Sequence, residues 1–409
     1  MSDFIAQHPV VVISLIKVIV LMILMMTALA YLSWFERKMV AHIQSRWGPY
    51  RVGPHGLLQP LADGLKFLFK EDPTPGGVDR LTYFLAPFLA MSLALSAIAV
   101  IPFGPGQPIE ILKGHPTGLQ IADVNIGLLF LFAITSLGVY GVALGGWSSN
   151  SKYPLLGGLR SSAQMISYEL AMTMSVVGVV LLAGSFNLRE IIEKQHGHWF
   201  GIPQWNLLAQ PLPQVIGFFC YFVAAIAETN RVPFDLPEAE TELVAGFHTE
   251  YASFKFAMFF LAEYANMITV SCLATLLFFG GWLSPFPATA RFAWTLYLPA
   301  ALLAVGAVWL FVDGLRYTTR LGRIVMPILA LAAAGLAVVC ALPGVMEIVQ
   351  GPFWFLSKVF CFLFFYVWAR GTLPRFRYDQ LMAFGWKLLL PLSLANVVLT
   401  SAMLLVSRK

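Results

Sequence analysis

The sequence is poor in charge and in cysteine. Charged residues make up only 11% of its 409 positions, and its four cysteines occur singly, with no C-x-x-C pair and no histidine at metal-ligand spacing. The chain also has no G-x-G-x-x-G and no Walker sequence, the glycine-rich loops that hold the phosphates of nicotinamide, flavin and nucleotide cofactors. We therefore expect no metal, iron–sulfur cluster, flavin or nicotinamide on this polypeptide. Any redox cofactor of its system then belongs to a partner.

Apolar residues dominate instead. They make up 58% of the chain and recur in runs of about twenty residues, the length that a helix needs to cross a bilayer. Lipid cannot satisfy backbone N–H and C=O groups, and the runs are too continuous for barrel strands, so each run is predicted to be a helix. The first run lacks a basic flank and a cleavage site, which favours a span over a signal peptide. The ten predicted spans are roughly 10–33, 81–103, 124–144, 163–184, 213–227, 254–280, 294–312, 324–342, 352–368 and 387–405.

The predicted fold class is therefore an all-α polytopic membrane protein, with residues 1–409 forming one integral membrane domain. Most of the 26 lysines and arginines fall in loops on one side of the membrane if the N-terminus lies outside. The positive-inside rule makes that side cytoplasmic, so we expect a bacterial inner-membrane protein with a periplasmic N-terminus. This asymmetry also explains the net charge of +5, and no nucleic-acid partner is expected.

Ionisable residues inside the spans are candidates for function, because a charge at the bilayer centre costs at least a few kcal/mol. Lys17 and Lys358 are close enough to the outer helix ends to extend their ammonium groups outward. Glu169 and Glu263 lie roughly 12 to 14 Å from the inner surface of a core about 30 Å thick. Their short side chains must face the bundle interior or a hydrated cavity. Proton transfer is the functional interpretation, and a protonated acid that only bonds a neighbouring helix is the structural alternative.

The inside loop 228–255 combines acids with apolar residues. Glu238, Glu240 and Glu242 occupy alternate positions, which an extended chain would align on one face, whereas a helix would pair only the first with the last. Carboxylates about 5 Å apart repel by roughly 3 kcal/mol at an effective dielectric near 20, so these acids are expected to share protons. Arg231 is the local counter-charge. A solvated acidic turn is the alternative, but the neighbouring proline, leucine and phenylalanine residues indicate that the loop packs onto the protein.

The inside loop 34–80 is basic and contains Glu36, Arg37 and Arg46. An amphipathic segment of about 20 Å follows them, too short to cross the bilayer, and we expect it to lie in the inner headgroup plane. An apolar substrate that enters beneath this helix would meet polar groups at the mouth of an apolar cavity. A quinone with a long isoprenoid tail requires that arrangement.

A third inside loop, 369–387, places Arg370 and further arginines among aromatic residues. An acidic partner that docks on this loop is one interpretation, and ordinary positive-inside anchoring is the other. Pro374 and Phe376 favour a fixed shape over a loose tail.

Five short motifs, spread in order over nearly the whole chain, resemble the H subunit family of proton-pumping NADH:quinone oxidoreductase, respiratory complex I. None is specific alone, but together they assign the family. The motifs are Glu-Arg-Lys at Glu36–Lys38, Gly-Leu-Leu-Gln-Pro-Leu-Ala-Asp at Gly56–Asp63, Ile-Ser-Tyr-Glu ending at Glu169, Glu-Thr-Asn-Arg beginning at Glu228, and Arg-Phe-Arg-Tyr-Asp-Gln at Arg375–Gln380.

The resemblance implies a subunit that joins the membrane arm to the hydrophilic electron-transfer arm and builds much of the quinone cavity. Its implied partners are the other membrane-arm subunits, the hydrophilic quinone-module subunits, quinone as substrate and membrane lipid, with FMN and the iron–sulfur clusters on partner subunits. By motif position, the implied quinone-path residues are Glu36, Arg37, Arg46, Arg231 and Arg370. The implied proton-transfer residues, which would couple quinone reduction to proton translocation, are Glu169, Glu228, Asp235, Glu238, Glu240, Glu242 and Glu263.

The sequence departs from the family pattern in two places. Segment 282–351 carries two spans that the usual eight-helix pattern lacks, and we expect this inserted pair to contact lipid or a neighbouring subunit. Some relatives carry a carboxylate where this chain has Ser136, so a proton path here must do without an acid at that position. Two other functions stay open, the membrane anchor of an energy-converting hydrogenase and an ion-coupled secondary transporter, although the chain shows no inverted repeat.

Overall fold

The computed structural model describes residues 9–106, 109–112, 115–199, 201–208, 212–235, 245–287, 289–317 and 320–407. Within these residues the protein is an assembly of long helices, which confirms the predicted all-α membrane class. Two very small antiparallel hairpins lie in the loops. They are β1 Ile109–Leu112 with β2 His115–Thr117, and β3 His198–Trp199 with β4 Ile202–Pro203.

In the described part of the chain, nine helices are long and apolar enough to cross a membrane. The predicted run 213–227 is also helical, but α8 has only 14 residues, about 21 Å against a hydrocarbon core of roughly 30 Å. The long helices are α2 Pro9–Ile43, α4 Arg80–Ala97, α5 Gly127–Ser148, α6 Lys152–Ala183, α10 Ser253–Phe278, α11 Leu298–Arg316, α12 Arg320–Cys340, α13 Pro343–Thr372, and α14 Tyr378–Phe384, which continues through a π-helical turn at Gly385–Leu389 into α15 Leu390–Ser407. The shorter helices are α3 Gln59–Phe69, α7 Leu188–Glu193, α8 Val215–Glu228, η1 Pro54–Gly56, η2 Ile98–Val100, η3 Gly246–His248 and η4 Ala290–Tyr297.

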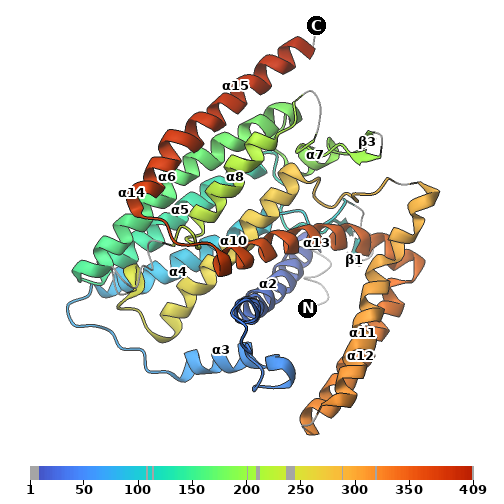
Figure 1. Cartoon of the computed structure of the whole chain (residues 1–409), viewed down its shortest axis with the longest axis horizontal. Coiled ribbons are helices and arrows are strands. Elements are labelled where there is room, and N and C mark those ends of the chain that lie inside the picture. Colours follow the sequence, from blue (N-terminus) through green and yellow to red (C-terminus); the bar gives the residue numbers. More distant parts are fainter. Residues whose placement is uncertain are drawn as a thin grey trace.

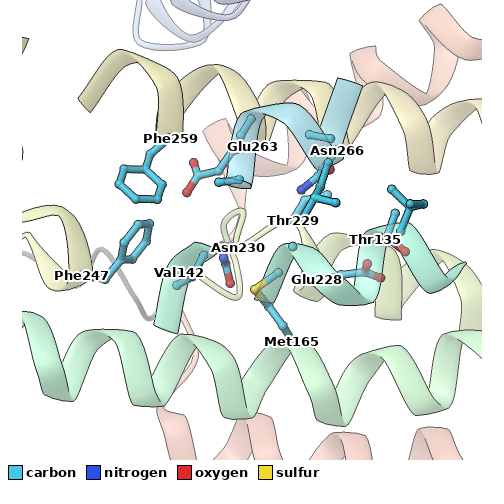
Figure 2. Close-up of a pocket in the computed structure, with 16 residues that line it drawn as sticks. Thr135, Val142, Met165, Glu228, Thr229, Asn230, Phe247, Phe259, Glu263 and Asn266 are labelled. Carbon is cyan, nitrogen blue, oxygen red and sulfur yellow. The ribbon is translucent and has the colours of Figure 1, made fainter. Parts of the chain in front are cut away.

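The central bundle consists of α4, α5, α6, α8 and α10, and α15 runs along α6 (Figure 1). Helix α10 is the most enclosed of these spans. In its apolar 18-residue stretch 67% is buried inside the protein, against 11% for α2. Helix α13 crosses past α10 and α2, and the α11–α12 hairpin stands at one side (Figure 1). Figure 2 enlarges the interior of the bundle, where α5, α6, α8 and α10 meet. Acids carried by these helices therefore face protein rather than lipid.

Glycines allow these helices to approach closely. A Cβ atom added to Gly146 of α5 would lie 3.0 Å from the Cα of Gly158 in α6 and 2.6 Å from the Pro154 carbonyl oxygen. A Cβ atom on Gly141 would lie 2.9 Å from Ala90 of α4. Apolar side chains gain no hydrophobic energy by leaving lipid for one another, so membrane helices depend on such close contact between small residues for their packing.

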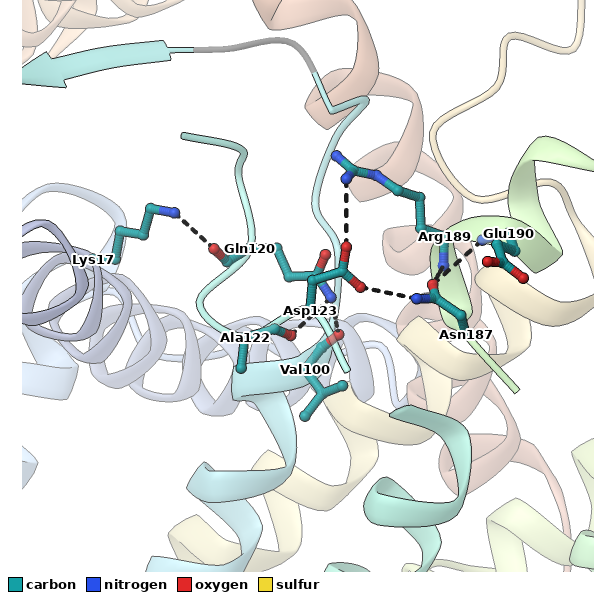
Figure 3. Close-up of polar contacts among 8 residues, drawn as sticks. All are labelled: Lys17, Val100, Gln120, Ala122, Asp123, Asn187, Arg189 and Glu190. Atoms are coloured by element: carbon teal, nitrogen blue, oxygen red, sulfur yellow. Dashed lines mark hydrogen bonds and ion pairs between the residues drawn. The ribbon is translucent and has the colours of Figure 1, made fainter. Parts of the chain in front are cut away.

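Polar contacts fix the loops at the end of the bundle that carries α7 (Figure 3). The Gln120 side-chain amide donates to the carbonyl oxygens of Val100 at 2.8 Å and Ala122 at 3.0 Å. Asn187 caps α7 by accepting the Arg189 N–H at 2.8 Å, and its own amide donates to Asp123 at 3.0 Å. These bonds satisfy backbone groups that the ends of helices would otherwise leave open.

Lys17 and Lys358 extend along their helices as predicted, but their ammonium groups reach protein carbonyls. Lys17 Nζ donates to the Gln120 carbonyl oxygen at 2.9 Å (Figure 3). Lys358 Nζ donates to three carbonyl oxygens beyond the end of α10, those of Phe279 at 2.7 Å, Gly281 at 2.9 Å and Leu283 at 2.7 Å. It also lies 4.3 Å from the Trp205 ring centre, a cation–π contact. Lys358 thus connects α13 to the turn after α10.

We predict that Lys358→Met destabilises the protein far more than Lys17→Met. The first change leaves three carbonyl oxygens without their charged donor, and the second leaves one. A loss on the order of 3 kcal/mol is expected for Lys358→Met and about 1 kcal/mol for Lys17→Met. Thermal unfolding of the detergent-purified chain measures the difference, and equal shifts for the two variants would contradict it.

Candidate functional site

Three of the predicted quinone-path residues meet around one buried carboxylate. Glu36 of α2 receives a hydrogen bond from Arg231 Nη1 at 3.1 Å, from the Tyr264 hydroxyl at 2.6 Å, and from Arg370 Nη1. Arg231 follows α8, Tyr264 belongs to α10 and Arg370 lies near the end of α13. We call these four residues the Glu36 cluster. Segments more than 300 residues apart in sequence are joined here, since Glu36 and Arg370 are separated by 334 positions.

The Glu36 cluster carries one negative and two positive formal charges. The Glu36 side chain is only 4% exposed, and the Arg231 guanidinium carbon lies 4.2 Å from the Tyr264 ring centre. Such a buried carboxylate is stable only when donors surround it, because the protein interior screens charge far less than water. Arg370 is 39% exposed, so the cluster opens toward the surface on its side. The N–H and O–H groups of the cluster suit the site to an oxygen-bearing acceptor.

Arg37 and Arg46 have other partners. Arg37 Nη1 pairs with Asp63 Oδ2 of α3 at 2.7 Å, and Arg46 Nε donates to the Gln44 side chain at 2.8 Å. The hydroxyl of Ser253, at the start of α10, donates to the Phe67 carbonyl oxygen in the last turn of α3 at 2.7 Å. Helix α3 is therefore held at its middle and in its last turn. The quinone-path role that the resemblance implies for Arg37 and Arg46 stays a prediction.

The start of the acidic loop packs against the basic loop 369–387. Asp235 accepts a hydrogen bond from Arg375 Nη2 at 3.0 Å. The Phe234 and Phe376 rings stack with centres 5.5 Å apart, and the Phe376 N–H donates to the Pro233 carbonyl oxygen at 3.0 Å. Residues 233–235 thus pack against residues 375 and 376. The predicted acids Glu238, Glu240 and Glu242 lie outside the described residues.

A small cavity, lined mostly by apolar residues but also by two carboxyl groups, lies beside the cluster. It encloses about 30 Å³, room for one or two water-sized molecules, and is lined by Glu228 at the end of α8 and Glu263 of α10. Figure 2 shows these carboxyl groups with the side chains of Thr229, Asn230 and Asn266. The apolar part of the lining consists of Ala90, Leu93, Ala94, Ile134, Gly138, Val142, Met165, Phe247, Phe259 and Ala262. The cavity therefore brings two of the predicted proton-transfer acids to one space.

Glu169 of α6 lies near this space but does not line it. The Ser136 hydroxyl of α5 donates to Glu169 Oε1, and the adjacent Thr135 lines the cavity. Glu169 is also close enough to Glu228 for the two carboxyl groups to interact electrostatically. Ser136 stands where some relatives are expected to carry an acid, and its hydroxyl supplies a hydrogen-bond donor at that point.

The cluster and the cavity share two stretches of backbone. Glu228, Thr229 and Asn230 line the cavity, and the next residue, Arg231, binds Glu36. In the same way Glu263 lines the cavity, and the next residue, Tyr264, donates to Glu36. A change of charge or position at Glu36 therefore acts on Arg231, three residues after Glu228, and on Tyr264, the residue after Glu263.

His248 lies next to the cavity, but it belongs neither to the Glu36 cluster nor to the residues that line the cavity. It follows Phe247, which lines the cavity, and its ring lies 5.0 Å from that of Phe247 and 5.2 Å from that of Phe256. Burial among these rings lowers the pKa of His248 from 6.5 to about 4. The imidazole is therefore uncharged at neutral pH.

Sequence reasoning missed Tyr264, Thr135, Asn230 and Asn266. Tyr264 and Asn266 stand one and three positions beyond Glu263, and Asn230 belongs to the Glu-Thr-Asn-Arg motif. Helical spacing from a buried acid was the available signal for Asn266, because residues three apart share a helix face. In the described part of the chain, no three His, Cys, Asp or Glu side chains gather as metal ligands.

Residues 16–401 match the family described as NADH dehydrogenase. The chain is 53% identical over 388 residues to the NADH-quinone oxidoreductase H subunit numbered 1 from Solibacter usitatus, an alignment that covers 95% of this chain and 96% of the relative. It is 49% identical over 396 residues to the H subunit numbered 2 from Koribacter versatilis, with the same coverage. The H subunit of Thermomicrobium roseum is 44% identical over 385 residues, 93% of each chain.

We predict strong energetic coupling between Glu36 and Arg231. The cycle Glu36→Gln with Arg231→Gln should give a coupling energy above about 1 kcal/mol, because each single change removes one charge from a buried ion pair. The matched cycle is Arg37→Gln with Asp63→Asn, in which Arg37 is 49% exposed, and a value below about 0.5 kcal/mol is expected there. Unfolding in mixed detergent micelles measures both, and similar values would contradict the prediction.

We also predict that His248→Gln leaves the pH dependence of activity unchanged between about pH 5.5 and 8. The wild-type imidazole is already neutral there, because its pKa is lowered to about 4. Activity of the assembled complex measured across this range is the test. A titration near pH 6.5 that disappears in the variant would show that His248 carries a proton in this range.

Proposed function

This chain belongs to the NADH dehydrogenase family, and from that premise we propose that its Glu36 cluster and its acid-lined cavity couple quinone reduction to proton movement. By family, it is a membrane subunit of NADH-quinone oxidoreductase, respiratory complex I, which translocates protons. The proposal concerns how its own residues serve that reaction.

The Glu36 cluster would form the polar end of the quinone path. Arg231, Arg370 and Tyr264 all present N–H or O–H donors at one place, and the carboxylate of Glu36 orients them. Quinone carbonyl oxygens accept hydrogen bonds, and a charged donor makes such bonds stronger. Reduction to quinol needs two electrons and two protons. The electrons would come from an iron–sulfur cluster of a partner subunit, as the resemblance implies.

The cavity acids would respond to the charge of the quinone. A unit charge about 10 Å away changes the energy of a carboxylate by roughly 1.7 kcal/mol at an effective dielectric near 20. Such a change alters the ratio of protonated to ionised carboxyl groups more than tenfold, because 1.36 kcal/mol corresponds to one pKa unit. Glu228 and Glu263 line one cavity and Glu169 lies beside it, so a proton can move among acids that are not all ionised together. Asp235 and the loop acids Glu238, Glu240 and Glu242 would extend this set toward the surface.

The proposal depends on the backbone that the Glu36 cluster and the cavity share. Arg231 and Tyr264 of the cluster are covalent neighbours of Asn230 and Glu263 of the cavity. A rearrangement of donors around Glu36 must therefore move or repolarise groups that line the cavity. No pathway of many side chains is needed between the two sites.

The proposed function also implies which surfaces of the protein contact lipid and which contact partner subunits. Helix α2 has most of its apolar surface uncovered, as expected for contact with lipid or with other membrane-arm subunits. The loops that contain Arg46, Arg231 and Arg375 would face the hydrophilic quinone-module subunits, which would hold the FMN and iron–sulfur clusters. We place the protein in the bacterial inner membrane with its N-terminus on the periplasmic side.

Replacing Glu263 by Gln in the assembled complex tests the coupling. The variant keeps the shape of the side chain but cannot exchange a proton, so NADH-driven quinone reduction and proton uptake by vesicles should fall by about tenfold. Electron transfer from NADH to a water-soluble artificial acceptor should stay unchanged, because that route bypasses the quinone site. Glu193→Gln, in the exposed last turn of α7, is the matched control. Full coupling in Glu263→Gln would refute the proton-transfer role.

A further inference from the structure

The α11–α12 hairpin has no part in the proposed function, and most of it is uncovered. In the apolar 18-residue stretch of the first span only 17% is buried in the protein, and in that of the second span 22% is buried. In Figure 1 the hairpin stands beside the bundle, with one end near the loop that leads into α3. The hydrogen bonds and ring contacts described between the hairpin and that loop centre on His55 of η1.

Three side chains of α11 and its end engage His55. The Trp309 ring stacks on the imidazole with centres 6.0 Å apart and planes 28° apart. Asp313 Oδ2 accepts a hydrogen bond from His55 Nε2 at 2.8 Å. The Tyr317 hydroxyl accepts the His55 backbone N–H at 2.8 Å, and its ring meets the imidazole edge-on at 5.5 Å. Trp309, Asp313 and Tyr317 follow each other at four-residue spacing, so they form one stripe along the helix.

The other side of His55 is held by the end of α2. Lys38 Nζ donates to the carbonyl oxygen of His55 at 3.0 Å and to that of Pro49 at 3.1 Å. His55 itself has a φ of 52°, a left-handed conformation that side chains other than glycine adopt only when the surroundings impose it. Its backbone donor and acceptor are therefore bound by two different elements, the hairpin on one side and α2 on the other.

The turn around His55 is itself closely packed. A Cβ atom on Gly56, where φ is 76°, would lie 2.3 Å from the Pro49 carbonyl oxygen, and one on Gly53 would lie 2.7 Å from Leu58. Lys38 is two residues beyond Glu36, so the turn is tied to the helix that carries the central carboxylate of the Glu36 cluster. The same turn leads directly into α3, beneath which a quinone is expected to enter.

We propose that the inner end of the hairpin clamps this turn and so fixes the entrance to the quinone path, with Trp309, Asp313 and Tyr317 as positioning residues that act through His55. This inference rests on the proposed function. An exposed ion pair by itself contributes little. Here one residue receives a stacked ring, a carboxylate and a backbone acceptor from a segment more than 250 positions away.

The test is the double variant Asp313→Asn with Tyr317→Phe in the whole complex. These changes keep side-chain shape but remove the carboxylate charge and the acceptor of the His55 N–H. Hydrogen–deuterium exchange of the peptide covering residues 50–58 should become about fivefold faster, because an exposed turn opens more often when a bond is lost. The KM for a long-tailed quinone should rise about fivefold while kcat changes less than about twofold. Electron transfer to a water-soluble acceptor should not change.

Two further variants make the outcome decisive. Glu347→Gln, an exposed carboxylate-to-amide change in the first turns of α13, should alter neither exchange nor KM. Unchanged exchange in the double variant overturns the clamp. Faster exchange with an unchanged KM overturns its role at the entrance. Glu36→Gln separates the two proposals: if quinone kinetics respond to it and not to the double variant, only the clamp has failed. If they do not respond to Glu36→Gln, the proposed quinone site has failed.

Discussion

The structure depends on keeping one carboxylate ionised at the edge of a membrane bundle. Glu36 is buried, and it is stable only because two guanidinium groups and a tyrosine hydroxyl surround it. Each of these donors comes from a different part of the chain. The Glu36 cluster therefore holds α2, the loop after α8, α10 and α13 in one arrangement, and the loss of any single donor removes a hydrogen bond from a buried, poorly screened carboxylate.

The same arrangement makes the site responsive. Arg231, Arg370 and Tyr264 gather charged and neutral donors at one place, and in the proposed function an oxygen-bearing substrate recruits them. The consequence reaches the cavity through covalent neighbours, since Arg231 follows Asn230 and Tyr264 follows Glu263. The glycine contacts between α4, α5 and α6 keep the walls of that cavity close-packed, so it stays small and holds little water.

Much of this could be predicted from sequence, and the limits have physical causes. Hydropathy located every long helix, because span length is set by the bilayer, and motif order assigned Glu36, Arg231 and Arg370 to one function before their contact was known. Hydropathy also predicted the short length of α8, since the apolar run 213–227 agrees with Val215–Glu228 within two residues. The partners of Lys358 were missed because backbone carbonyls have no sequence signature. The contact between His55 and Asp313 was missed because it joins positions 258 residues apart, and local periodicity carries no such information.

The short length of α8 has an electrical consequence. A helix of 14 residues that begins at one membrane face ends roughly 9 Å before the opposite face. A charge moved through the full transmembrane voltage exchanges about 2.3 kcal/mol per 100 mV. On the proposed proton route, a proton at Glu228, the last residue of α8, would cross only the remaining fraction of that voltage on its way to the nearer surface. Most of the electrical work of translocation would then fall on the route that leads from Glu228 toward the far side.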